Sequence, residues 1–291
     1  MSTTGQAIHV ALTFDDAFWA PAYATMRSVC VATDRKSDLV FHLLNLGLTA
    51  EHRKDLDAIS KEYGAQLVYH PLENSDLLGE RIALLPKVKV RRLHNIVYAR
   101  LFIQHVVPAS AKRVVYLDCD VAVRTPIEQL AEMDMAGKTI AAVQQPERFK
   151  QAGGHDLRDN KGLSMTKPYF NAGVLLIDPE RYRKVDIVGS LTERLTPAQI
   201  ERVYYDQDIL NIVFADDILE LEARWNLQNP EPAHEAFNPL IVHYSGVAKP
   251  WSLKSNVAYA ETYRHTMTNE LFYRFWRYRL AKGAKRLIGL G

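Results

Sequence analysis

The stretch VVYLDCDVAV, residues 114–123, decides the fold of this chain. Its first four residues are typical of a buried strand, and two acids, Asp118 and Asp120, follow almost directly. In an extended chain, side chains i and i+2 leave the same face about 6 to 7 Å apart, so both carboxylates would point in one direction. Like charges this close repel, so we expect a cation at the end of this strand. The competing possibility is that each carboxylate only caps a turn or pairs with Arg124.

Strand-like and helix-like segments alternate on both sides of this stretch. The expected helices include a second one closed by Gly64, an apolar one around 96–107 and one that begins near 204. This alternation predicts an α/β fold with a mostly parallel sheet and a helical C-terminal extension. Besides the opening stretch, the expected strands lie at 7–14, 39–46, 65–70, 139–145, 170–179, 218–226 and 239–246.

Composition and charge narrow the class of protein. Apolar residues make up 47% of the 291 residues, which is ample for a core, and no uninterrupted apolar run reaches the roughly 18 to 20 residues of a membrane span. The N-terminus has no basic residue before its short apolar run, and Cys30 and Cys119 lie in apolar segments. We therefore expect a cytoplasmic protein with reduced thiols. The net charge of +2 includes six basic residues after position 270 and leaves −4 for the rest, so nucleic acid is not an expected partner.

A second motif, HYSGVAKPW at 243–251, follows an expected strand. A histidine at a strand end is more often structural than a ligand, but here Gly246 and Lys249 follow His243. A glycine lets the backbone approach a ligand and a lysine offers a point charge, as a diphosphate requires. Two aspartates and one histidine also form a plausible ligand set for Mn²⁺.

Further polar residues begin or end other expected elements. Of Asp15 and Asp16, one is expected to cap the following helix, which leaves the other to accept hydrogen bonds from a base or ribose. Asn171 begins an expected strand, whereas Asp206 and Asp208 begin an expected helix, where capping is the simpler role. The motifs of P-loop, dinucleotide-binding, structural-zinc and serine-hydrolase proteins are absent.

Six motifs, in this order, resemble those of the glycosyltransferase family 8 enzymes, especially the bacterial lipopolysaccharide galactosyl- and glucosyltransferases. They are FDD, YARL at 98–101, YLDCDV, FNAGVLLI, YDQDILN and HYSGVAKPW, and they span about residues 8–251. The resemblance implies a GT-A fold, the Rossmann-like fold of nucleotide-diphospho-sugar transferases, with a catalytic domain at 1–255 and a basic, aromatic segment at 256–291. It implies hexose transfer from a UDP-hexose, galactose or glucose, to a glycan or glycolipid acceptor such as a lipopolysaccharide core, with retention at the anomeric carbon.

The resemblance also implies a metal and a diphosphate site. The metal would be Mn²⁺, with Mg²⁺ as the alternative, and its ligands would be Asp118, Asp120 and His243. Asp120 would also lie near the ribose, and Gly246 and Lys249 would hold the diphosphate.

Other positions would contact the nucleotide and the donor sugar. Asp15 would meet uracil or ribose, while Arg100 and Asn171 would lie around the donor sugar. This chain departs from the family pattern at Ala17, where relatives often have Asn, and at Gln144, where relatives often have an acid. Ala17 cannot make the side-chain hydrogen bond to the nucleotide that Asn makes in those relatives. Gln144 implies that the donor hexose can differ from that of relatives with an acid at this position.

The catalytic candidates are Asp206, Gln207 and Asp208, of which the first two would also border the donor sugar. Retention requires either a double displacement through a protein nucleophile or attack on the face from which phosphate leaves. Gln207 is a poor nucleophile and the two aspartates are better ones. We favour the front-face path, in which the leaving phosphate accepts the proton of the acceptor.

Two alternatives remain for the activity and two for the tail. The chain could instead be a glycogenin-like self-glucosylating protein or a non-catalytic module that binds a nucleotide sugar.

In the tail, an apolar face with Phe272, Trp276 and Leu280 and a separate basic face are expected on one helix. The basic face carries Arg274, Arg277, Lys282 and Lys285. Such a helix is predicted to lie on an anionic membrane, here the inner face of the inner membrane, unless its aromatic residues pack on the body. The loop at 146–168 is expected to act as a lid with 245–249.

Overall fold

The computed structural model describes residues 6–73, 85, 95–145, 163, 168–203 and 205–287. Within them the main sheet has the order β3-β2-β1-β4-β7-β6-β8. β7 runs antiparallel to both of its neighbours and the other pairs are parallel, which confirms the expected mostly parallel sheet. The strands are β1 (Ile8–Asp15), β2 (Leu39–Leu46), β3 (Gln66–Pro71), β4 (Val114–Leu117), β6 (Ile140–Gln144), β7 (Phe170–Ile177) and β8 (Ile218–Leu221).

The reversed strand β7 brings the beginning of one strand to the end of another. Leu117 of β4 pairs with Val174 of β7, and the Asp118 backbone N–H donates to the Gly173 carbonyl at 2.8 Å. Because β4 ends where β7 begins, residues after Leu117 and residues before Val174 lie at the same end of the strands. We call this end of the sheet the site edge. The polar residues that the sequence places after β4 and at the beginning of β7, among them Asp118 and Asn171, therefore lie at this edge.

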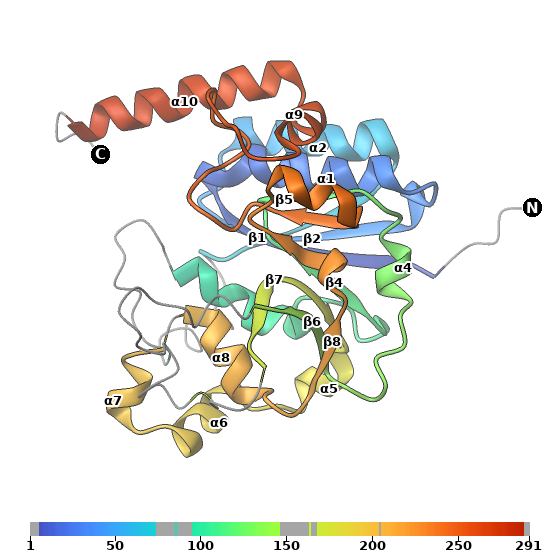
Figure 1. Cartoon of the computed structure of the whole chain (residues 1–291), viewed down its shortest axis with the longest axis vertical. Helices are drawn as coiled ribbons and strands as arrows, with labels where there is room; N and C mark the ends of the chain where they lie inside the picture. The colour runs from blue at the N-terminus through green and yellow to red at the C-terminus, as the bar shows by residue number, and fades with distance from the viewer. Residues whose placement is uncertain are drawn as a thin grey trace, which may run out of the picture.

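The stretch 114–123 supplies two sheets rather than one strand. After β4 the chain turns at Asp118 and Asp120 and enters a smaller sheet of order β5-β10-β9 (Figure 1). The Thr25 hydroxyl lies 3.0 Å from the carbonyl oxygens of both Cys119 and Val121, which holds this turn on helix α1. The strands are β5 (Val121–Val123), β9 (Leu227–Gln228) and β10 (Ile241–His243).

Helices lie on both sides of the sheets (Figure 1). Helix α2 ends as expected at Gly64, which has a φ of 72° and donates its N–H to the Ser60 carbonyl. One side carries α1 (Trp19–Ala32), α2 (Ala50–Tyr63), α9 (Ala260–Met267) and α10 (Asn269–Leu287). The other side carries η3 (Asn95–His105), α5 (Pro179–Arg183), α6 (Ile187–Arg194), α7 (Pro197–Ile200) and α8 (Tyr205–Val213). The remaining short helices described are η1 (Asp16–Phe18), η2 (Lys36–Asp38), α4 (Glu128–Ala131), η5 (Ala223–Asn226) and η6 (Pro232–Phe237).

Three expected elements differ from those observed. The strand expected at 239–246 is limited to Ile241–His243 of β10. The helix around 96–107 is a 3₁₀ helix, η3, with a kink at Phe102. The strand expected at 218–226 ends at Leu221, and the 3₁₀ turn η5 follows because Trp225 donates its N–H back to the Glu222 carbonyl. The expected lid at 146–168 lies outside the described residues apart from 163 and 168. None of the helices described is long and apolar enough to cross a membrane.

The C-terminal helices pack on the body through aromatic residues. Phe272 and Phe275 of α10 are buried, and Phe275 lies edge-on to Trp19 of α1 at 5.2 Å. Arg274 forms ion pairs with Asp55 of α2 at 2.9 and 3.0 Å. The alternative of packing on the body therefore holds for the first half of α10. The division between the catalytic domain and the tail at residue 255 stays a prediction.

Candidate functional site

Two aspartates and a histidine converge where β4 and β10 end. Asp118, Asp120 and His243 each offer one ligand atom, and these atoms lie within 4.8 Å of one another. His243 Nε2 lies 3.3 Å from Asp120 Oδ1 and 3.7 Å from Asp118 Oδ2. Burial alone would raise the pKa of Asp120, but His243 and Lys249 outweigh it and hold this pKa well below its ordinary value. The chemistry of this donor set, two carboxylates and one imidazole, suits a divalent cation.

Gly173 on β7 allows the three side chains to meet. A Cβ at this position would collide with His243 Cε1 and would lie 2.7 Å from Asp118 Oδ2. The backbone of β7 therefore forms one wall of the cluster, and only a residue without a side chain fits.

Asp118, Asp120 and His243, the three candidate metal ligands, are together called the metal cluster below. Arg100 of η3 connects them to helix α8. Its guanidinium forms ion pairs of 2.9 Å with Asp118 and Asp206 and donates to the Ala172 carbonyl at 2.9 Å. The same group lies over the Tyr116 ring, 4.6 Å from its centroid. Burial raises the pKa of Asp206 to about 6, although Arg100 opposes this rise.

Gln207 of α8 has all four of its hydrogen-bonding positions occupied by the protein. Its Oε1 accepts from Asn171 Nδ2 and from the Ala172 N–H, both at 3.1 Å. Its Nε2 donates at 3.0 Å to Gln145 Oε1 and to the Tyr169 hydroxyl. Because a primary amide has two acceptor and two donor positions, Gln207 is fixed in one orientation.

Three further residues complete this network. Gln145 also accepts from Asn171 Nδ2 at 3.2 Å, and the Tyr169 hydroxyl donates to Asp208 at 2.6 Å. Sequence reasoning missed the roles of Gln145 and Tyr169, although Gln145 ends the strand expected at 139–145 and Tyr169 directly precedes the motif FNAGVLLI. Asn226 of η5 was missed too: its Nδ2 donates to Asn171 Oδ1 at 2.8 Å.

The loop after β10 lies beside the metal cluster. Lys249 Nζ lies 2.7 Å from Asp120 Oδ2 and also donates to the Tyr244 carbonyl. Gly246 lies close to Asn229, since a Cβ at Gly246 would be 2.5 Å from Asn229 Oδ1. The structure thus places Lys249 next to the candidate ligand Asp120 and leaves no space for a side chain at Gly246.

Asp15, the last residue of β1, and Asp16, the first of η1, have different environments. The expectation that one of them caps the following helix is wrong, because neither η1 nor α1 has a side-chain cap hydrogen bond. Asp16 Oδ1 instead accepts from the Thr49 N–H at 2.8 Å and contacts His52 Nδ1 at 2.7 Å, at the start of α2. Asp15 ends β1, which runs parallel to β4, so it lies on the site edge of the sheet. Of the predicted pair, Asp16 is therefore structural and Asp15 keeps the candidate role.

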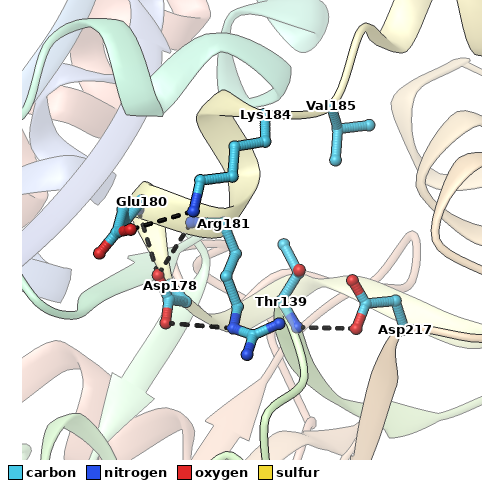
Figure 2. Close-up of a pocket in the computed structure, with 7 residues that line it drawn as sticks. All are labelled: Thr139, Asp178, Glu180, Arg181, Lys184, Val185 and Asp217. Carbon is cyan, nitrogen blue, oxygen red and sulfur yellow. Dashed lines mark hydrogen bonds and ion pairs between the residues drawn. The ribbon is translucent and has the colours of Figure 1, made fainter.

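A separate cavity of about 450 Å³ lies where β7 ends, opposite the cluster (Figure 2). Its charged groups bond to each other or to the backbone: Glu180 pairs with Lys184 at 3.0 Å, and Asp217 accepts from the Thr139 N–H at 3.1 Å. Among the described residues, the three candidate metal ligands and the hydrogen-bond network of Gln207 lie at the other edge, so we place the functional site there.

The topology of the main sheet, with an Asp-x-Asp turn and a histidine at its site edge, defines a glycosyltransferase of the GT-A fold. The model of glycosyl transferase family 8 matches residues 9–255, and the chain belongs to that family.

Individual relatives agree with this assignment. The chain is 26% identical over 281 residues to General stress protein A of Bacillus subtilis (strain 168), covering 90% of this chain and 94% of that protein. It is 28% identical over 258 residues to a lipopolysaccharide 1,3-galactosyltransferase of Salmonella typhimurium, covering 84% and 72%. The structure is similar to that of the galactosyltransferase LgtC in complex with donor and acceptor sugar analogs, with a TM-score of 0.73, 26% identity and coverage of 89% of this chain and 95% of that chain.

Proposed function

We propose that this protein transfers galactose or glucose from a UDP-hexose to a glycan acceptor, such as a lipopolysaccharide core oligosaccharide, with retention at the anomeric carbon. The observation that carries this proposal is the convergence of Asp118, Asp120 and His243 at the site edge of a GT-A sheet. Family membership supports hexose transfer, and relatives that are named as lipopolysaccharide glycosyltransferases support the class of acceptor.

The three converging side chains would hold Mn²⁺, with Mg²⁺ as the alternative. A divalent ion in this position acts as a Lewis acid that stabilises negative charge on the leaving diphosphate. Lys249, now paired with Asp120, would add a second positive charge, and Gly246 would let the loop backbone approach the phosphates. The carboxylates at the end of β4 are explained by this role.

The donor would lie along the site edge of the sheet, from β1 to β7. Asp15 would accept hydrogen bonds from uracil or ribose, and Asp120 would also lie near the ribose. Arg100, Asn171 and Asp206 would border the hexose, because they surround the beginning of β7 beside the metal cluster.

The reaction would follow the front-face path. Both lone pairs of Gln207 Oε1 accept hydrogen bonds, Asp206 is paired with Arg100 and Asp208 accepts from Tyr169, so each candidate nucleophile is engaged. The bond from the anomeric carbon to the phosphate oxygen would break as the acceptor oxygen bonds to that carbon on the same face. The acceptor proton would pass to the leaving phosphate oxygen, and Gln207 would act indirectly, by fixing Asn171 and the Ala172 backbone beside the sugar.

The proposal places the protein in the cytoplasm, at the inner face of the membrane where a lipid-linked acceptor would be found. The second half of α10 supports this, because Leu280 is 53% exposed and α10 extends beyond the body (Figure 1). Lys282 and Lys285 on this half are exposed.

A screen of labelled UDP-hexoses with Mn²⁺ and no added acceptor tests the donor. Release of free hexose from one UDP-sugar that requires Mn²⁺ is the expected result, with retained configuration when an acceptor is added. Label on the protein itself would instead indicate self-glucosylation. Donor binding without hydrolysis or transfer to any supplied glycan would indicate a non-catalytic module.

A further inference from the structure

Asn226 is almost fully buried, with 1% of its surface exposed, at the end of the 3₁₀ turn η5. Its side chain lies between two residues of the site: Nδ2 donates to Asn171 Oδ1 at 2.8 Å, and Oδ1 lies 2.9 Å from His243 Nδ1. It reaches no part of the metal cluster except through His243.

The orientation of these amides follows from a backbone donor. The Gly173 N–H donates to Asn171 Oδ1 at 2.9 Å, and a backbone N–H cannot reverse its role. The Asn171 oxygen must therefore face Asn226, which turns the Asn226 amino group towards Asn171 and its oxygen towards His243. His243 then carries a hydrogen on Nδ1.

Because Nδ1 carries this hydrogen, Nε2 of the neutral ring keeps its lone pair on the side of the carboxylates. With Nδ1–H donating to Asn226, His243 presents Nε2 to Asp120 at 3.3 Å and Asp118 at 3.7 Å. A ligating histidine requires such a partner on its other nitrogen to fix its ring and its tautomer.

We propose that Asn226 is a positioning residue that holds His243 as a metal ligand and joins the metal cluster to the amide network of Asn171 and Gln207. This inference rests on the proposed metal role of His243. It assigns Asn226 no contact with metal or sugar, so its effect must pass through His243.

The test uses Mn²⁺ alone, titrated into the full chain without nucleotide, with free Mn²⁺ followed by electron paramagnetic resonance. Asn226→Leu keeps the branched shape of the side chain but removes both hydrogen bonds, and we expect the Kd for Mn²⁺ to rise about 10- to 100-fold. Asn226→Ala should do the same if the leucine variant does not fold. Asn226→Asp keeps an acceptor for Nδ1–H and should stay within about threefold of the wild type.

A double-mutant cycle separates positioning from general damage. In a His243→Ala chain, adding Asn226→Leu should leave the Mn²⁺ affinity unchanged, because the partner through which Asn226 acts is gone. Asn45 serves as a matched control: it is buried, and among the residues that the structure describes it donates to the Leu43 carbonyl and contacts none of the three candidate ligands, so Asn45→Leu should leave the Mn²⁺ affinity unchanged.

Four results would overturn the inference. They are wild-type affinity in a folded Asn226→Leu or Asn226→Ala chain, an equal loss in Asn226→Asp, a further loss in the His243→Ala background, and an equal loss in Asn45→Leu. A wild-type chain that bound no Mn²⁺ would overturn the metal site itself, and the inference with it, which distinguishes the two failures.

Discussion

Gly173 lies where two candidate ligands occupy the space of a side chain. Because a Cβ would collide with His243 and would lie 2.7 Å from Asp118, Gly173→Ala should displace both and abolish Mn²⁺ binding. Its cost in stability should be about 1 to 3 kcal/mol, as for other overpacked sites. Mn²⁺ titration and urea unfolding measure the two effects.

Gly64→Ala is the control for that prediction. Gly64 has a φ of 72° with nothing within 4 Å of the added Cβ, so the substitution should cost about 1 to 2 kcal/mol through backbone strain alone. If Gly64→Ala lost as much Mn²⁺ binding as Gly173→Ala, instability would account for both results and the steric argument would be wrong.

The three candidate ligands should act as one unit. Asp118→Ala, Asp120→Ala and His243→Ala should each abolish Mn²⁺-dependent turnover of the donor, because each removes a ligand from the same ion. The double variant Asp118→Ala/His243→Ala should be no worse than either single variant. Near-normal turnover by a folded double variant in Mn²⁺ would show that the metal lies elsewhere.

At the scale of residues, sequence reasoning identified three side chains that the structure brings together, Asp118, Asp120 and His243, but missed residues that hold the site in place. Asp118, Asp120 and His243 belong to motifs at strand ends, where their chemistry is readable. Asn226 and Tyr169 act through partners 17 and 39 positions away, His243 and Asp208, and neither residue has a local pattern that reveals this. Their roles follow only from the fold.

Three neighbouring strands carry a row of histidines. His9 of β1, His42 of β2 and His70 of β3 are linked by side-chain hydrogen bonds of 3.0 and 3.3 Å. Burial, with a smaller contribution from the neighbouring histidines, lowers the pKa of His42 to about 3. Burial also lowers the pKa of His9 and of His70.

These histidines predict a loss of stability in acid. A histidine of the unfolded chain has a pKa of about 6.5, so the unfolded state takes up a proton between pH 7 and 5 that His42 in the folded state does not. The free energy of unfolding should therefore fall by about 2 kcal/mol over this range on account of His42. His42→Gln should remove most of that fall in urea unfolding at the two pH values, whereas His265→Gln, at an exposed position, should leave it unchanged. An unchanged pH dependence in His42→Gln would contradict the prediction.

At the scale of elements, periodicity predicted the strands best where both faces are buried. The segment at 39–46 matches β2 residue for residue, because a short apolar run bounded by turn residues is typical of a strand in the middle of a sheet. The strand expected at 114–117 is likewise β4, but the sequence did not reveal that residues 121–123 pair in a second sheet, since pairing partners are tertiary information. The reversal of β7, which brings Asn171 to the site, is likewise invisible in a local pattern.

At the scale of the whole molecule, the C-terminal helix has two halves with different surroundings. Phe272 and Phe275 belong to the core of the body, so removal of residues from 271 onward would expose that core and confuse binding with unfolding. Leu280 is exposed, and Lys282 and Lys285 lie beyond it on the part of α10 that extends from the body (Figure 1). We therefore test the proposed membrane contact on this second half, where substitutions leave the buried aromatic residues in place.

The paired substitution Lys282→Glu/Lys285→Glu should therefore weaken sedimentation with anionic vesicles and leave hydrolysis of a UDP-hexose in solution unchanged. Each cation near an anionic surface contributes about 1 kcal/mol, so loss of two should reduce vesicle binding by about 30-fold at low salt, before the repulsion of the new carboxylates. Lys112→Glu/Lys184→Glu makes the same change of charge at two exposed positions away from α10 and should bind vesicles like the wild type. If both pairs weakened binding equally, net charge alone would account for it; if neither did, α10 would not be the membrane contact.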